Sequence, residues 1–193
     1  MKVILYFGSF NPVHNGHIAL ADAVSKQFQA PVWFVLSPQN PFKQDQNLWN
    51  ERLRERLLRE SLLTHPSLEF CDAELQLPKP SYTVNTLQYL QKRHPETEFY
   101  ILMGQDNLCG LHRWKEIDLI LSTCRVLVYP RKETAPQPET YPILERFSAK
   151  ITLLNNLPLL DISSSLIRQK LAQGEDISGL VPWQTALLRP DTL

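Results

Sequence analysis

The chain has 193 residues, of which 43% are hydrophobic and 21% charged, and 20 Lys and Arg side chains balance 20 Asp and Glu side chains. A chain of this size predicts one domain that needs no disulfide or structural metal to hold its core. The zero net charge argues against nucleic acid or an anionic membrane as a partner. The sequence contains no run of about 18 consecutive apolar residues, so no membrane-spanning helix is predicted.

Six short apolar runs predict strands, at residues 3–7, 32–36, 68–71, 99–103, 125–129 and 151–154. Several runs are apolar on consecutive residues, which suits strands that are buried on both faces. Between them, longer segments predict helices at 16–28, 47–64, 83–94, 114–121 and 142–147. This alternation predicts an α/β fold with a doubly wound parallel sheet of five or six strands, covered by helices on both faces.

The end of the chain has a different pattern. Serines begin and Gly174 ends a predicted helix at 163–173, and a second short helix is expected at 182–188. We therefore divide the single domain, residues 1–193, into a core over 1–160 and a small helical C-terminal portion over 161–193. The proline-rich stretch 130–142 predicts a solvated surface loop.

The strongest chemical signal follows the first strand, where G-S-F-N-P-V-H-N-G-H runs from Gly8 to His17. Gly8 lets the backbone approach a ligand, and the free N–H groups of the helix that follows suit a phosphate. His14 and His17 are three residues apart, so at a helix start they share a face and can donate hydrogen bonds to a phosphoryl oxygen. The alternative, one capping and one core histidine, is less favoured because both flank a glycine at a strand–helix junction.

A second signal, D-I-S-S-S-L-I-R, occupies residues 161–168. Its serines can cap a helix, and Arg168 can clamp a phosphate with its planar guanidinium. Taken alone, the pattern is more often only a capped helix. The arginine-rich stretch 51–59 interleaves acids and bases around an apolar stripe, and it predicts a solvated amphipathic helix rather than a nucleic-acid patch. The remaining tryptophans, Trp33, Trp49 and Trp183, are interpreted as packing.

Together, the two motifs resemble the H-x-G-H nucleotidyltransferase superfamily, whose signatures are GGTFDPxHxGH and ISSTxIR. The chain departs from the first signature at Phe7, Ser9 and Asn11, and from the second at Ser165. The resemblance implies a Rossmann-like fold and an ATP site, with His14, His17 and Arg168 as catalytic residues. It implies that ATP contacts Gly8, Ser9, Phe10, His14, His17, Gly104, Asp106, Ser163, Ser164 and Arg168.

Three further segments are similar to the nicotinate-nucleotide adenylyltransferases: P-Q-N-P-F-K at 38–43, P-S-Y-T-V-N-T at 80–86, and G-Q-D-N-L at 104–108 with Trp114 downstream. This likeness runs from Val3 to about Trp183. It implies that Tyr82 and Thr83 recognise the nicotinate carboxylate, that Trp114 stacks on the pyridine ring, and that Lys43 lies near phosphate. The alternatives are a core position for Trp114 and a helix-capping role for Asp106.

The implied reaction transfers AMP from ATP to nicotinate mononucleotide and releases pyrophosphate, a step of NAD biosynthesis. The attacking phosphate oxygen is already anionic, so the chemistry needs positioning and charge stabilisation rather than a general base. Mg²⁺ is expected to arrive with ATP, held mainly by phosphates and water, and no protein metal site is predicted. Nicotinamide mononucleotide or phosphopantetheine remain alternative acceptors, and a non-catalytic nucleotide-binding regulator is the alternative from another class.

The cellular setting is inferred from the cysteines. Cys71, Cys109 and Cys124 are odd in number and lack C-x-x-C spacing, which argues against a disulfide framework or a zinc site. The expected location is therefore the cytoplasm. The resemblance implies ATP and nicotinate mononucleotide as partners, and the zero net charge predicts neither nucleic acid nor a membrane as a partner. A homo-oligomer is left open.

Overall fold

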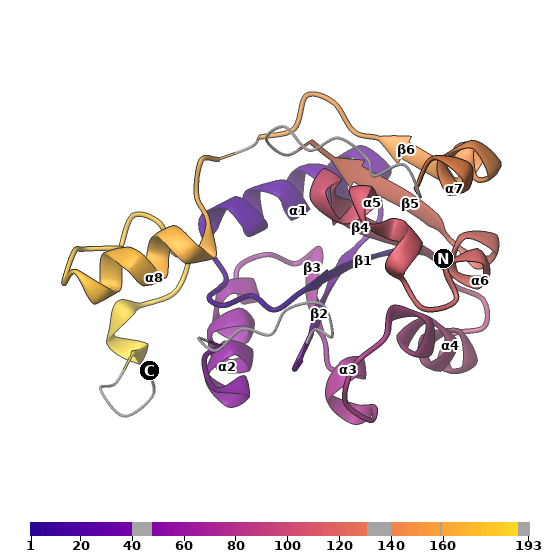
Figure 1. The fold of residues 1–193 in the computed structure, drawn as a ribbon. Coiled ribbons are helices and arrows are strands. Elements are labelled where there is room, and N and C mark those ends of the chain that lie inside the picture. Colours follow the sequence, from indigo (N-terminus) through magenta and orange to yellow (C-terminus); the bar gives the residue numbers. More distant parts are fainter. Residues whose placement is uncertain (40–47, 131–139, 159, 189–193) are drawn as a thin grey trace.

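The structure is a computed structural model that describes residues 1–39, 48–130, 140–158 and 160–188. Six parallel strands form a single sheet in the order β3-β2-β1-β4-β5-β6. Helices lie on both sides of this sheet, and helix α8 projects from one end of the molecule (Figure 1). The predicted α/β fold with a doubly wound parallel sheet is confirmed, at the upper of the two expected strand numbers.

The strands are β1 (Lys2–Gly8), β2 (Val32–Leu36), β3 (Leu68–Cys71), β4 (Glu98–Gly104), β5 (Arg125–Tyr129) and β6 (Ile151–Leu153). The helices are α1 (Asn15–Phe28), α2 (Glu51–Leu62), α3 (Ala73–Gln76), α4 (Thr83–Arg93), α5 (Gln105–Cys109), α6 (Ile117–Thr123), α7 (Tyr141–Arg146) and α8 (Ser164–Ala172). Short 3₁₀ turns lie at Leu111–Arg113, Ser148–Lys150 and Thr185–Leu187. Each predicted strand matches an observed strand to within one residue at either end.

Two apolar clusters sandwich the sheet, because successive side chains of a strand point to opposite faces. On β1, Ile4 and Tyr6 belong to the cluster that includes residues of α1 and α2, whereas Val3 and Leu5 belong to the cluster that includes residues of α4 and α6. All four side chains are buried. Strand β1 is therefore apolar on consecutive residues because it is buried on both faces of the sheet, as its sequence indicated.

The order of the strands reverses between β1 and β4. Strand β1 pairs with β2 on one side and with β4 on the other, with Tyr6 opposite Leu102. Both central strands run to a glycine, Gly8 and Gly104, at the same edge of the sheet. In open parallel sheets the connections leave in opposite directions at such a point and open a crevice for a ligand.

Two of the predicted helices differ from the observed elements. The helix expected at 114–121 is replaced by a 3₁₀ turn that ends at Arg113 and by α6, which begins only after Glu116 in a left-handed conformation (φ 52°). Trp114 therefore lies in the connection between them. At 182–188 only one 3₁₀ turn forms, at Thr185–Leu187.

Two short helices, α3 and α5, were not expected. They have four and five residues, so neither is long enough to show a helical period in the sequence. None of the helices in the described ranges is long and apolar enough to cross a membrane. None of the three cysteines, which all lie within the described residues, forms a disulfide, and all three are buried.

Candidate active site

The turn after β1 is shaped by the buried ring of Phe10. Phe10 has a left-handed backbone (φ 42°), which is uncommon for a residue other than glycine. Its ring lies against Gly8, where an added Cβ would come within 2.9 Å of the ring. Glycine is therefore required at position 8 for this turn to close. Of the predicted ATP contacts, Phe10 has its side chain in the core, only 2% exposed.

The two motif histidines stack on each other at the start of α1. Their ring centroids lie 3.6 Å apart with an interplanar angle of 27°. The backbone N–H of His14 donates a hydrogen bond to Nδ1 of His17 (3.2 Å). Because a neutral imidazole has one acceptor and one donor nitrogen, this contact puts the proton of a neutral His17 on Nε2. The half-buried His17 can then donate that proton in a hydrogen bond to a ligand.

Gly16 makes room for this stack. A Cβ at position 16 would lie 3.0 Å from Nδ1 and 3.1 Å from Cε1 of His14. Any side chain here therefore pushes against the His14 ring. The glycine of H-x-G-H is needed for the packing of the ring rather than for an unusual backbone angle.

The C-terminal portion holds the same turn from outside. Three consecutive backbone carbonyls, at residues 11–13, accept hydrogen bonds from Arg168 Nη1 (2.6 Å), Ser164 Oγ (2.8 Å) and Trp183 Nε1 (3.0 Å). Ser163 caps α8 by accepting from the backbone N–H of Leu166 (3.1 Å). Trp183 is buried, as its interpretation as a packing residue expects. Ser164 and Arg168 thus have contacts that fix the turn, and their proposed contacts with a triphosphate stay a prediction.

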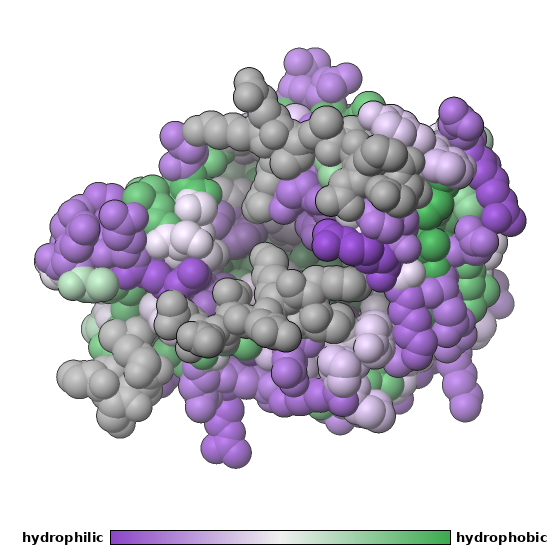
Figure 2. Space-filling view, in the orientation of Figure 1, coloured by the Kyte–Doolittle hydropathy of each residue, from purple (hydrophilic) through white to green (hydrophobic). Residues whose placement is uncertain are grey.

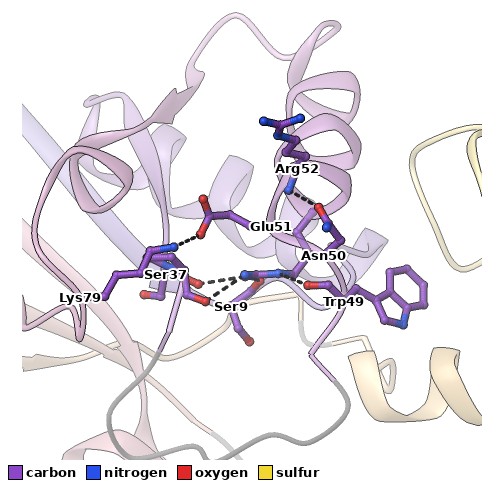
Figure 3. Close-up of polar contacts among 9 residues, drawn as sticks. Ser9, Ser37, Trp49, Asn50, Glu51, Arg52 and Lys79 are labelled. Atoms are coloured by element: carbon purple, nitrogen blue, oxygen red, sulfur yellow. Dashed lines mark hydrogen bonds and ion pairs between the residues drawn. The ribbon is translucent and has the colours of Figure 1, made fainter. Parts of the chain in front are cut away.

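A buried arginine, Arg54 of α2, holds the turn from inside. It is 1% exposed, and its guanidinium donates to the carbonyls of Ser9 (2.7 Å), Ser37 (2.8 Å), Pro38 (3.0 Å) and Trp49 (3.0 Å). Figure 3 shows Ser9, Ser37 and Trp49 converging from the segment after β1, the segment after β2 and the segment before α2. Burial lowers the pKa of Arg54 to about 10, so it stays charged near neutral pH.

The prediction of a solvated helix at 51–59 is therefore wrong for Arg54. The apolar stripe is buried as expected, but Arg54 precedes Leu57 and Leu58 by three and four residues and so shares their face. That spacing was the signal in the sequence. The balance of acidic and basic residues in this segment masked the buried position of Arg54.

The departure at Asn11 has a structural account. Its Oδ1 accepts a hydrogen bond from the backbone N–H of Trp49 (3.0 Å). An oxygen acceptor is all that this contact needs, and either an amide or a carboxylate provides it. Asparagine can therefore stand where the motif has aspartate.

A first cavity of ≈ 260 Å³ opens at the carboxyl edge of the sheet. It collects five of the predicted site residues: Gly8, Ser9, Tyr82, Thr83 and Trp114. Its wall also includes residues that were not among the predicted site residues, such as Phe7, Ser37, Glu74, Ser81, Arg113 and Lys115. The half-buried Phe7 thus shapes this cavity directly where the motif has glycine. The Lys115 ammonium lies 4.9 Å from the centroid of the Tyr82 ring, so the cavity has both an aromatic and a cationic side.

A second cavity of ≈ 670 Å³ lies on the α8 side of the same strand end. It collects four other predicted residues, His14, His17, Asp106 and Ser163, and its wall includes Gly16, Tyr6, Tyr129, Leu160, Asp161 and Ile162. Asp106 is in the first turn of α5, the helix that begins directly after Gly104. Figure 2 shows this face of the molecule hollowed between α8 and the middle of the molecule. Both cavities are therefore lined by residues from the end of β1, Phe7 and Gly8 in the first and Tyr6 in the second.

Lys43 lies outside the described residues, so its predicted place near phosphate stays a prediction. Across the residues that the structure describes, no three His, Cys, Asp or Glu side chains are grouped to hold a metal ion.

Comparisons with known proteins agree with this geometry. A family model described as cytidylyltransferase-like matches residues 5–170. A probable nicotinate-nucleotide adenylyltransferase from Flavobacterium psychrophilum is 38% identical over 183 residues, which are 94% of this chain and 92% of that protein. A protein of the same description from Bacteroides thetaiotaomicron is 38% identical over 178 residues, covering 92% of this chain and 85% of its own.

Solved structures agree on the fold. The nicotinic acid mononucleotide adenylyltransferase of Plasmodium falciparum, complexed with NaAD, superposes with a TM-score of 0.72 over 93% of this chain and 90% of its own, at 21% identity. A putative nicotinate-nucleotide adenylyltransferase from Vibrio parahaemolyticus gives a TM-score of 0.66 at 18% identity, covering 93% of this chain and 86% of its own. At these identities the likeness supports the fold alone.

Proposed function

The chain belongs to the cytidylyltransferase-like family of nucleotidyltransferases, and from that premise we propose that it transfers AMP from ATP to nicotinate mononucleotide, yielding nicotinate adenine dinucleotide and pyrophosphate for NAD synthesis. The observation that carries the proposal is that residues from the end of β1 line two cavities, with the stacked histidines in one and the Tyr82–Trp114 wall in the other. Two nucleotides need two adjoining sites.

The reaction is an in-line displacement at the α-phosphorus of ATP. An oxygen of the acceptor's 5′-phosphate forms the new P–O bond, and the bond to the bridging oxygen of pyrophosphate breaks. The attacking phosphate is anionic near neutral pH, so no side chain has to remove a proton. The protein must align the two phosphates and stabilise the charge that develops on them.

The stacked histidines supply that stabilisation. With Nδ1 occupied by the His14 backbone, His17 presents Nε2–H to a phosphoryl oxygen. Fixed donors aimed at developing charge are among the largest contributions to such reactions. Arg168, at the outer side of the turn, and Lys43 are proposed to contact the outer phosphates. The positive dipole end of α1 adds to the same field.

The first cavity is proposed to hold the acceptor. Helix α4 begins at Thr83, which lines this cavity, so the positive dipole end of the helix lies beside it and suits a carboxylate. Trp114 offers a flat aromatic face for the cationic pyridinium ring. The second cavity is then left for ATP, with Asp106 facing the adenosine.

Mg²⁺ is proposed to accompany ATP and to neutralise charge on its phosphates. The carboxylate of Asp161 lines the second cavity and is of the ligand type that Mg²⁺ prefers. Since no larger group of such side chains is present in the described residues, phosphates and water would supply most of its coordination.

The test is pyrophosphate release with ATP and Mg²⁺ in the presence of nicotinate mononucleotide, nicotinamide mononucleotide or phosphopantetheine. We expect kcat/KM for nicotinate mononucleotide to exceed the other values by about 10-fold or more. Pyrophosphate release with only another acceptor would support nucleotidyl transfer and contradict the proposed recognition of the pyridine carboxylate. Binding of ATP without turnover of any acceptor would instead favour a nucleotide-binding regulator.

Gly16→Ala provides a test of the histidine stack. The new methyl group would lie 3.0 Å from His14 Nδ1, so the ring must shift and carry His17 with it. Since a misplacement of about 1 Å can cost about 100-fold in rate, we expect kcat to fall about 10- to 100-fold with a nearly unchanged melting temperature. Gly179→Ala is the matched control, because a Cβ there meets nothing within 4 Å. Equal rates for both variants would contradict the proposed role of the stack.

A further inference from the structure

A buried carboxyl group that the mechanism does not use faces the first cavity. Glu74 of α3 is only 2% exposed and lines this cavity with Ser81, Tyr82 and Thr83. Its Oε1 accepts a hydrogen bond from Thr86 Oγ1 on α4 (3.2 Å). Its Oε2 has no hydrogen-bond partner among the described residues, and neither has the buried Oγ of Ser81. Two polar atoms on one wall of the cavity therefore lack the partners that buried polar groups normally have.

The surroundings of Glu74 favour its neutral form. Burial raises the pKa of the Glu74 carboxyl group, and the nearby hydroxyls of Ser37, Thr86 and Ser81, of which Thr86 is hydrogen-bonded to it, oppose the shift. A neutral carboxyl group has an O–H that can donate a hydrogen bond, whereas an ionised carboxylate only accepts. Such a group can therefore meet an anionic ligand without charge repulsion.

The position of Glu74 says which part of a ligand it would meet. Thr86 belongs to the first turn of α4, so the Glu74 carboxyl lies beside the N-terminus of that helix. The proposed function assigns that N-terminus to the carboxylate on the pyridine ring. Glu74 and Ser81 form the remaining polar part of the same wall.

We propose that Glu74 is a specificity-determining residue, whose carboxyl O–H donates a hydrogen bond to the ring carboxylate of the acceptor while the Ser81 hydroxyl donates a second. This inference rests on the proposed function and adds a selection step to it. An acceptor with a carboxamide offers only one oxygen to these two donors and places an NH₂ donor against the other. The polar wall thus favours the acid over the amide.

Two substitutions at Glu74 test the inference, because they separate hydrogen bonding from packing. Glu74→Leu removes both oxygens, and we expect KM for nicotinate mononucleotide to rise about 10-fold or more, with kcat and KM for ATP within about 2-fold of wild type. Glu74→Gln retains a donor of the same size, and we expect KM within about 3-fold. Glu74→Leu should also narrow the preference for nicotinate mononucleotide over nicotinamide mononucleotide. Glu69→Gln, at an exposed position of β3, is the matched control.

The contrary outcomes are distinct. An unchanged KM for nicotinate mononucleotide in Glu74→Leu overturns the inference. An equal rise of KM for nicotinate mononucleotide and for ATP, together with a lowered melting temperature, also overturns it, because Glu74 would then serve only the contact between α3 and α4. If Glu74→Leu does not fold, Ser81→Ala decides: a selective rise of KM for nicotinate mononucleotide by about 3-fold or more supports the inference, and no change overturns it. Failure of the wild-type protein to use nicotinate mononucleotide would overturn the proposed function itself.

Discussion

His17→Ala is expected to lower kcat by about 100- to 1,000-fold, with little change in the melting temperature. The size of the effect follows from removing one fixed donor at the site of developing charge. His17 is half-buried at the end of the second cavity, and its ring is aligned by the His14 backbone and by the stack. The substitution therefore removes a group that we propose to face the reacting phosphates, and it leaves the hydrophobic clusters intact. Steady-state kinetics with ATP and nicotinate mononucleotide measures the change.

The control for this substitution is another histidine. His65→Ala removes an imidazole whose Nδ1 lies 2.8 Å from Asp22 and which does not line either cavity. We expect its kcat to stay within about 2-fold of wild type, as for a surface pair of small energetic value. A purified, folded His17→Ala protein that turns over near the wild-type rate would exclude the proposed role of His17.

Arg54→Met is expected to lower the free energy of unfolding by about 3–4 kcal/mol. Methionine retains much of the aliphatic volume but has no N–H donors, so the carbonyls of Ser9, Ser37, Pro38 and Trp49 lose their hydrogen bonds. Each buried acceptor left unsatisfied costs about 1–3 kcal/mol, and water or relaxation recovers part of the total. Denaturant unfolding monitored by circular dichroism gives the value.

Arg56→Met provides the comparison for Arg54, since it lies on the same helix at an exposed position. Its free energy of unfolding is expected to change by less than about 0.5 kcal/mol. Because Arg54 also ties together the segments after β1 and β2, its loss should raise KM for the acceptor at the first cavity. Equal stabilities of the two variants would contradict the role of Arg54 as an internal anchor.

Local patterns carried much of what the sequence predicted. The six strands could be predicted because each is a contiguous apolar run, and burial on both faces leaves that mark on neighbouring residues. The pairing of His14 with His17 followed from a three-residue spacing at a helix start, which is again a local relation. The family could be recognised for the same reason, since its signatures are short and continuous.

Contacts over long separations left no such mark. The bond from Arg168 to the Asn11 carbonyl joins residues 157 positions apart, and that from Trp183 to Val13 joins residues 170 apart. A carbonyl acceptor is present at every residue, so the sequence cannot show which carbonyl a side chain will find. The sequence analysis therefore predicted that Ser164 and Arg168 contact ATP, but it did not predict the hydrogen bonds that both side chains donate to the turn after β1.

The sequence by itself determined the six strands, the H-x-G-H turn and the chemistry of the side chains in that turn, because these depend on neighbours along the chain. Only the tertiary structure decided that Tyr82 and Trp114 share one cavity while His17 and Asp106 share another, and that Arg54 and Glu74 are buried beside them. The physical reason is that burial of a charged group is set by the elements packed around it. Those elements come from distant parts of the chain and meet only at the carboxyl edge of the folded sheet.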